Sequence, residues 1–182
     1  MRTFIAIELN QETKDFLSSV QKELNNTGID AKWVEAHNLH MTLKFLGEID
    51  DAMLLKVKKS LEVCAARFTA CEVALTGFGF FPNDRKPRVF FASTDQEARL
   101  RQIVSCLEDE LGMLGFPKDD AFKSHITLAR IKSPKNVEAL KRALSSLESR
   151  GKFMVNGITL FKSVLNRQGP VYEVILKANF KS

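Results

Sequence analysis

The chain has 182 residues, enough for one domain or for two small lobes that share a core. No segment approaches the apolar length of a membrane span, which argues against a membrane protein, and the hydrophobic fraction of 45% is typical of a globular fold. The net charge of +5 suits a protein that meets polyanions, but it is too mild for a dedicated nucleic-acid coating protein. Three cysteines without a paired spacing predict buried free thiols in a reducing cytoplasm and no bound metal.

Hydrophobic periodicity in the first half predicts alternating strands and helices. Residues 1–8 lack the long apolar core of a signal peptide and have the pattern of a strand. Asn10 is a favourable N-cap for the helix that follows. In chain order we expect strand 2–9, helix 10–25, strand 32–34, strand 40–47, helix 50–66, a glycine-interrupted strand 69–81 and a turn at 82–87.

The second half repeats this order of elements. An Arg-x-Phe-apolar-Ala sequence opens both halves, at 2–6 and 88–92, and the next histidine motif follows the alanine after 34 residues in one half and 33 in the other. Such a repeat predicts a single domain over 1–182 with two similar lobes, roughly 1–82 and 88–182, which exchange strands about a pseudo-two-fold axis. The expected elements are strand 88–92, a helix across 100–111, strand 122–131, helix 134–148, strands 153–165 and 171–178, and a turn at 166–170.

Two of the three histidines carry the same His-x-Thr-Leu sequence, at 40–43 and 125–128. That tail follows a given histidine by chance in roughly half a per cent of cases. Residues two apart on a strand share a face, so each histidine projects together with Thr42 or Thr127 while the apolar residues face the core. A pseudo-two-fold axis would bring the two copies together across one cleft.

Two imidazoles with neighbouring hydroxyls are suited to acid–base chemistry on a phosphate. One neutral ring can accept a proton from water while the other, protonated, donates to a departing oxygen. A threonine hydroxyl can stabilise charge on a non-bridging phosphate oxygen. The sequence has neither a zinc ligand set nor a Gly-x-x-x-x-Gly-Lys-[Ser/Thr] loop, which favours metal-free phosphodiester hydrolysis over nucleoside-triphosphate chemistry. One motif alone would indicate a structural histidine at a strand end, whereas the matched pair indicates function.

The two motifs, with their flanking residues, resemble the bacterial RNA 2′,3′-cyclic phosphodiesterase family (LigT-like, formerly 2′-5′ RNA ligase) of the 2H phosphoesterase superfamily. The resemblance spans the whole chain. Two departures are Ser124, where relatives often have Pro, and Phe91, where Trp is frequent. The matching segments are 40–47, 87–89 and 125–130, together with Ser163-x-Leu165 and Gly169-Pro170-x-Tyr172.

This resemblance implies a bilobal α+β fold, in which two antiparallel sheets line a central cleft and the helices lie outside. It implies hydrolysis of RNA 2′,3′-cyclic phosphate ends, tRNA-like fragments included, to 2′-phosphomonoesters, with reversible ATP-independent 2′-5′ ligation as a side activity and no cofactor. His40 would be the proton donor and His125 the proton acceptor, while Thr42, Thr127 and Arg130 would bind the phosphate. We expect a cytoplasmic monomer without membrane contact.

Other residues are weaker candidates for contacts with the substrate. Strict alternation places Arg130 on the core face, so that it reaches the phosphate only if the strand ends or twists there. Lys44 has the parity of the histidine face, and it is either a substrate contact or a solvated cleft-rim residue. Phe45 has the parity of the core, with stacking on a terminal base as the alternative. Arg88 could contact the RNA backbone, and His37 lies in a loop outside both motifs.

Two alternatives remain open at this point. The same site could act on a small cyclic phosphate or on a 2′-5′ linked oligonucleotide. A second alternative is a non-catalytic module that binds RNA ends with a vestigial site, although the presence of both histidines and both threonines counts against it.

Overall fold

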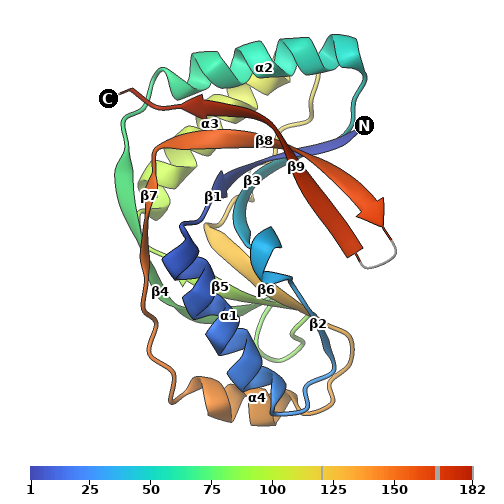
Figure 1. Cartoon of the computed structure of the whole chain (residues 1–182), viewed down its shortest axis with the longest axis vertical. Helices are drawn as coiled ribbons and strands as arrows, with labels where there is room; N and C mark the ends of the chain where they lie inside the picture. The colour runs from blue at the N-terminus through green and yellow to red at the C-terminus, as the bar shows by residue number, and fades with distance from the viewer. Residues whose placement is uncertain (120, 167–168, 182) are drawn as a thin grey trace.

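The computed structural model describes residues 1–119, 121–166 and 169–181, and it has an α+β fold built on two antiparallel sheets (Figure 1). No helix in these residues is long and apolar enough to cross a membrane. In chain order the elements are β1 (Arg2–Glu8), α1 (Gln11–Asn25), β2 (Ala31–Trp33), the 3-10 helix η1 (Ala36–Asn38), β3 (His40–Glu48), α2 (Asp51–Ala65), β4 (Cys71–Phe81), β5 (Val89–Thr94), α3 (Glu97–Gly112), β6 (His125–Ile131), α4 (Val137–Leu144), β7 (Lys152–Val155), β8 (Gly157–Asn166) and β9 (Gly169–Asn179).

Each sheet combines strands from both halves of the chain. One sheet has the order β3-β1-β8-β9, and the other has the order β2-β6-β5-β4-β7. The strand that begins with His40 is thus an edge strand beside β1, and the strand that begins with His125 lies between β2 and β5. Figure 1 shows α2 and α3 together at one end of the molecule and α1 and α4 at the other.

The helices form where a cap precedes an amphipathic sequence. In α1 the side chain of Asn10 accepts a hydrogen bond from the Thr13 N–H at 3.0 Å, as the sequence predicts. Leu17, Val20 and Leu24 then recur at helical spacing and are fully or almost fully buried. Burying each of these side chains stabilises the fold by roughly 1.5–3 kcal/mol, so the apolar face fixes the helix against the core.

β3 and β6 carry the same β-bulge, three residues after the histidine that begins each strand. Between β1 and β3, Thr42 and Lys44 pair with consecutive residues of β1, which leaves Leu43 without a partner. Between β5 and β6, Thr127 and Ala129 pair with consecutive residues of β5, which leaves Leu128 without one. A bulge of this kind reverses the alternation of the side chains that follow it.

The bulges correct three predictions that assumed strict alternation. Lys44 is buried, although its parity placed it on the face of His40. Phe45 is 68% exposed, although its parity placed it in the core. Arg130, at the position in β6 that corresponds to Phe45, is also exposed. Both Phe45 and Arg130 therefore face the same side of their sheets as the histidines.

The repeated Arg-x-Phe-apolar-Ala sequences are displaced by one residue in the structure. Ala6 pairs with Thr42, whereas Phe91, and not Ala92, pairs with Thr127. The structural equivalents Ala6 and Phe91 precede their histidines by the same distance along the chain (40 − 6 and 125 − 91, both 34).

The C-terminal strands also differ from the prediction. The single strand expected over 153–165 is two strands, β7 in one sheet and β8 in the other. The chain crosses between the sheets at Gly157, where a Cβ atom would lie 2.6 Å from the carbonyl oxygen of Ala178. Helix α4 is shorter than the predicted 134–148. The predicted turn at 166–170 includes residues 167 and 168, which lie outside the described part of the chain.

Candidate active site

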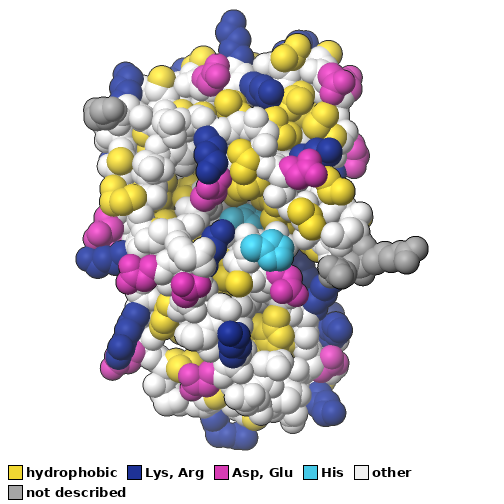
Figure 2. Space-filling view, viewed as in Figure 1, with side chains coloured by type: hydrophobic (Ala, Val, Ile, Leu, Met, Phe, Trp, Pro, Cys, Tyr) yellow, Lys and Arg dark blue, Asp and Glu magenta, His cyan; other side chains and the backbone are white. Residues whose placement is uncertain are grey.

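A cleft of about 710 Å³ contains both His-x-Thr motifs. Strands β3 and β6 contribute the histidines and threonines, β1 contributes Arg2, and the β8–β9 hairpin contributes Tyr172. Figure 2 shows histidine side chains in the middle of the molecular face, between its two ends. The duplicated motif is therefore assembled into one site.

Two hydrogen bonds orient the ring of His40. Its Nδ1 lies 2.6 Å from the carbonyl oxygen of Asn38, and its Nε2 lies 2.9 Å from the hydroxyl oxygen of Thr42. Because a carbonyl oxygen can only accept, Nδ1 carries the hydrogen and, in the neutral ring, Nε2 carries the lone pair. Nε2 is thus the nitrogen that could accept a proton from, or donate one to, a group beside Thr42.

The second histidine repeats the first of these two hydrogen bonds. The Nδ1 of His125 lies 2.7 Å from the carbonyl oxygen of Lys123, again two residues upstream. The rings of Phe81 and Phe91 pack edge-on against His125, with centroid separations of 5.0 and 5.6 Å. Thr127 lines the cleft two residues further along β6. The backbone before each motif therefore presents both imidazoles in the same tautomer.

Aromatic packing removes water from much of the ring of His40. Phe4 and Tyr172 contact it at centroid separations of 5.0 and 5.3 Å. Burial lowers the pKa of His40 below its ordinary value, and the charges of Lys14 and His125 lower the pKa further, while the hydrogen bond to Asn38 opposes these shifts. The influence of His125 on the pKa of His40 agrees with two titratable rings that face one cleft.

The pKa of His125 is also lowered, mainly by burial. The hydrogen bond to the Lys123 carbonyl opposes this shift, as does the negative charge of Glu97, whereas the ammonium group of Lys123 adds to it. In the unliganded protein both rings therefore favour the neutral form at neutral pH.

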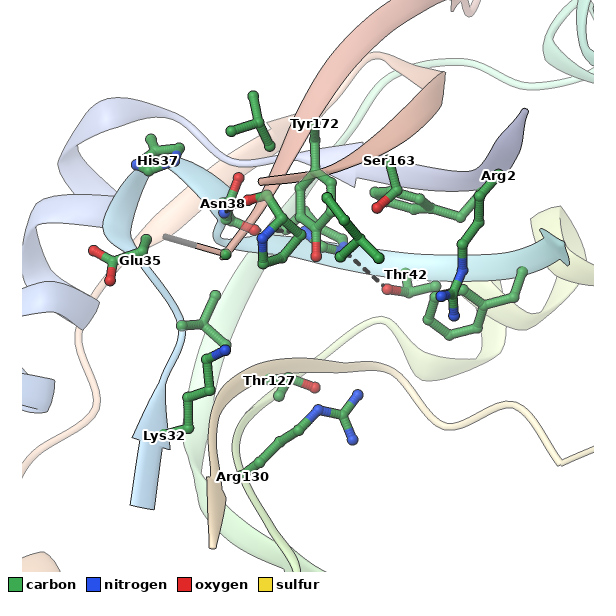
Figure 3. Close-up of a pocket in the computed structure, with 18 of the residues that line it drawn as sticks. Arg2, Lys32, Glu35, His37, Asn38, Thr42, Thr127, Arg130, Ser163 and Tyr172 are labelled. Atoms are coloured by element: carbon green, nitrogen blue, oxygen red, sulfur yellow. Dashed lines mark hydrogen bonds between the residues drawn. The ribbon is translucent and has the colours of Figure 1, made fainter. Parts of the chain in front are cut away.

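Guanidinium groups give the cleft a positive lining. Arg2 and Arg130 both line it, and both charges act to lower the pKa of Tyr172, which burial raises overall. Figure 3 shows Thr42 and Thr127 on opposite sides of the cleft, with the side chain of Arg130 beside Thr127. Two hydroxyls, two guanidinium groups and two imidazoles around one space suit an anionic phosphate group.

The structure places six of the predicted site residues together, and it places Lys44 and Arg88 elsewhere. The ammonium group of Lys44 is buried on the other side of β3, where it contacts the carboxylate oxygens of Glu108 at 2.8 and 2.7 Å and the carbonyl of Pro117 at 2.8 Å. Arg88 is exposed and does not line the cleft. The six that line the cleft are His40, Thr42, Phe45, His125, Thr127 and Arg130.

Several residues that line the cleft or orient its histidines were not predicted as functional. Asn38 and Lys123 hold the imidazoles through their carbonyl oxygens, which have no signature in the side-chain sequence. Arg2 and Tyr172 come from strands far away in the chain. His37, in η1, also lines the cleft, although its loop position gave no reason to expect this.

The described side chains do not form a set of metal ligands. Within residues 1–119, 121–166 and 169–181, no group of three or more His, Cys, Asp or Glu side chains is arranged to hold a metal ion. The two imidazoles of the cleft are groups suited to acid–base chemistry.

Comparisons with known proteins agree with this geometry. A sequence model of the family described as LigT like Phosphoesterase matches the chain twice, over residues 7–91 and 92–172. A Thermotoga maritima protein named RNA 2′,3′-cyclic phosphodiesterase is 32% identical over 182 residues, covering 100% of this chain and 96% of the relative. An Archaeoglobus fulgidus protein of the same name is 34% identical over 175 residues, covering 95% and 97%.

Solved structures share the fold. The crystal structure of TT0787 of Thermus thermophilus superposes with a TM-score of 0.82 at 30% identity, covering 99% of this chain and 98% of that one. The structure of E. coli LigT complexed with 3′-AMP has a TM-score of 0.77 at 24% identity, covering 100% and 98%, and shows likeness of fold alone. With a duplicated His-x-Thr cleft and two matches to one family model, this chain belongs to the LigT-like family of 2H phosphoesterases.

Proposed function

We propose that this protein hydrolyses the 2′,3′-cyclic phosphodiester at the end of an RNA chain to a 2′-phosphomonoester, without a metal ion or another cofactor. The observation that carries the proposal is the pair of imidazoles with Nδ1 bound to a backbone carbonyl, each two residues before a threonine that lines the same cleft. Full-length relatives named RNA 2′,3′-cyclic phosphodiesterase support the choice of substrate.

In the proposed reaction the two histidines take opposite roles. The Nε2 of His125 accepts a proton from water as the water oxygen attacks phosphorus. The bond from phosphorus to O3′ breaks, its electron pair passes to O3′, and protonated His40 donates to that oxygen. The product carries a 2′-phosphate and a free 3′-hydroxyl. This assignment of acid and base follows the family resemblance.

The hydroxyl groups and the arginine side chain would hold the phosphate during this step. The hydroxyl of Thr42 lies 2.9 Å from Nε2 of neutral His40, and once that nitrogen is protonated it becomes a donor itself. The Thr42 hydroxyl can then turn its hydrogen to a non-bridging oxygen. Thr127 and the guanidinium group of Arg130 complete the set, and they stabilise the charge that develops on the phosphate oxygens.

The substrate itself would help to place the proton on His40. Burial keeps the pKa of His40 low in the unliganded protein. An anionic phosphodiester beside the ring favours the imidazolium form and raises this pKa. Protonation of the acid would therefore accompany binding of the substrate.

Joining of RNA ends follows from the same chemistry with a different nucleophile. When the 5′-hydroxyl of a second RNA takes the place of water, its oxygen attacks phosphorus, the bond to O3′ breaks, and O3′ takes a proton, which leaves a 2′-5′ linkage. In the reverse step the free 3′-hydroxyl attacks this linkage, the 5′-hydroxyl leaves, and the cyclic phosphate forms again. Such ligation needs no ATP, because the cyclic phosphate already contains the reactive phosphodiester. The RNA partners would be fragments with cyclic phosphate ends, which a monomer could bind through this cleft.

The decisive experiment uses an oligonucleotide that ends in a 2′,3′-cyclic phosphate, incubated with the protein in EDTA and without ATP. We expect hydrolysis, with the product phosphate on the 2′ oxygen. A 3′-phosphate product would reverse the assignment of the leaving oxygen, and loss of activity that zinc restores would move the site to metal chemistry. Turnover of a small cyclic nucleotide or a 2′-5′ dinucleotide in preference to the RNA end would favour the alternative substrates.

Replacing the histidines tests the paired roles. We expect His40→Ala and His125→Ala each to lower kcat by about 10²–10⁴-fold, because each removes one proton-transfer group. RNA affinity should stay within a few fold, since the arginine side chains and the threonine hydroxyls remain. His37→Ala, which removes an exposed imidazole from the cleft rim, is the matched control and should retain activity. Near-normal turnover by either motif variant would refute the acid–base pair.

A further inference from the structure

A carboxylate binds the peptide that precedes the second catalytic motif. Glu97, in the first turn of α3, accepts hydrogen bonds through Oε2 from both the N–H of Ser124, at 2.9 Å, and the hydroxyl of the same serine. Ser124 is only 2% exposed. The side chain of Glu97 therefore fixes the position of the backbone immediately before His125.

The amide group bound by Glu97 is the one that holds His125. The N–H of Ser124 and the carbonyl of Lys123 belong to one peptide unit, and that carbonyl accepts the Nδ1–H of His125 at 2.7 Å. Hydrogen bonds at the two ends of one amide polarise each other, so a carboxylate at the N–H makes the carbonyl a stronger acceptor. We propose that Glu97 is a positioning residue that acts through the Lys123–Ser124 peptide to fix the tautomer of His125 and to strengthen its hold on a proton.

In the first motif a backbone carbonyl takes the place of this carboxylate, although the Nδ1 of the histidine is held in the same way. The Nδ1 of His40 binds the carbonyl of Asn38, and the N–H in that peptide unit belongs to Leu39. Leu39 donates to the carbonyl of Ala36 at 3.3 Å, which is a neutral acceptor. The two histidines, whose Nδ1 atoms are held in the same way, thus differ in whether a negative charge lies behind the peptide that orients them.

This difference is relevant to which histidine acts as acid and which as base. This part of the inference rests on the proposed reaction. A carboxylate behind a histidine stabilises the imidazolium that forms when the ring accepts a proton. The position of Glu97 therefore agrees with the assignment of His125 as the group that takes the proton from water.

The other charges around this unit leave the carboxylate ionised. Burial raises the pKa of Glu97, but the hydrogen bonds from Ser124 and the ion pair of Oε1 with Arg101, at 2.7 Å, lower it more, so that the net shift is downward. The ammonium group of Lys123 lies over the rings of Phe81 and Phe91 and acts against protonation of His125. The other ionisable side chains that line the cleft are His40, His37, Tyr172, Glu35, Lys32, Arg2 and Arg130.

The test is an NMR pH titration of the histidine ring signals in Glu97→Gln, which keeps the shape of the side chain and removes its charge. The chain has only three histidines, so each titration curve can be assigned with single variants. We expect the pKa of His125 to fall by about 0.5 units, less than the shift caused by a direct charge contact because Glu97 is partly exposed. The pKa of His40 should move less than half as far.

Two further variants locate the effect. Glu110→Gln removes another ion-paired carboxylate of α3, about 20 Å along the helix, and should leave the pKa of His125 unchanged. Ser124→Ala keeps the peptide N–H and Glu97, so the pKa of His125 should stay closer to the wild-type value than in Glu97→Gln. An unchanged His125 pKa in folded Glu97→Gln, or an equal fall in Ser124→Ala, would overturn the proposal. Since these titrations need no substrate, their outcome is independent of whether the protein hydrolyses RNA ends.

Discussion

The imidazoles of His40 and His125 lie in surroundings that lower the pKa of each below 6.5, with burial as the main cause. The dependence of kcat/KM on pH reports the protonation states of the free enzyme. The rate rises with pH as the base loses its proton and falls as the acid loses its own, so the optimum lies midway between the two macroscopic pKa values. We therefore expect a bell-shaped profile with its optimum on the acid side of pH 6.5, measured with a cyclic-phosphate oligonucleotide at constant ionic strength.

The profile of kcat provides an internal control for this expectation. In the complex the anionic phosphodiester raises the pKa of both rings, so the optimum of kcat should lie at higher pH than that of kcat/KM. An optimum of kcat/KM clearly above pH 6.5, or coincident profiles, would show that burial does not govern the working pH of the pair.

At the residue scale, the sequence identifies side chains that the fold brings into one cleft, but it does not identify the backbone groups that orient them. The two histidines and the two threonines could be found because their identities recur. The carbonyls of Asn38 and Lys123 could not, because every residue carries a carbonyl and only its position in the fold gives it a role. For the same reason, the sequence does not reveal that the Lys123–Ser124 peptide links Glu97 to His125.

At the scale of the element, the β-bulges of β3 and β6 decide which residues enter the cleft. Hydrophobic alternation identifies both strands, but it cannot show that Leu43 and Leu128 lack partners in the ladder, because pairing depends on the neighbouring strand. Because the bulge at Leu43 was not foreseen, the predicted environments of both Lys44 and Phe45 were wrong. The bulge at Leu128 explains how Arg130 reaches the cleft.

The bulge at Leu43 in β3 turns Lys44 inward, where it pairs with Glu108, and this buried ion pair should contribute to the stability of the fold. It joins β3 to α3, with side chains only 5% and 8% exposed. We expect Lys44→Met to lower the free energy of unfolding by about 3 kcal/mol, because it leaves the Glu108 carboxylate buried without its partner. Chemical denaturation of the variant would measure this loss.

Two comparisons separate the effect of the buried charge from the effect of losing a lysine. Lys162→Met removes a lysine whose ion pair with Glu173 is partly exposed, and it should cost less than about 1 kcal/mol. Combining Lys44→Met with Glu108→Leu should recover most of the loss, because no unpaired charge then remains inside. A single variant as stable as the wild type would mean that the buried pair contributes nothing.

At the scale of the whole molecule, the duplication explains why two distant motifs share one cleft. The repeat was visible in the order of the elements, and both halves match the same family model. The sharing of strands between sheets was less accessible, since β7 and β8 follow each other closely in sequence yet pair with different partners. No local pattern shows which of two sheets a strand joins, because that choice depends on contacts with residues far away in the chain.

The crossing between the two sheets places a steric demand on Gly157. An added Cβ atom would lie 2.6 Å from the Ala178 carbonyl oxygen and 3.1 Å from the Cα of Asn179, both backbone atoms of β9. Since this backbone cannot rotate away as a side chain can, we expect Gly157→Ala to lower the free energy of unfolding by about 1–3 kcal/mol. Gly112→Ala is the matched control: its Cβ would meet only the flexible end of Lys118 at 3.5 Å, and alanine favours the helix, so stability should stay equal or rise. Denaturation curves for both variants decide the matter, and a Gly157→Ala protein as stable as Gly112→Ala would mean that the crossing tolerates a side chain and that the sheets are less tightly joined there than the distances imply.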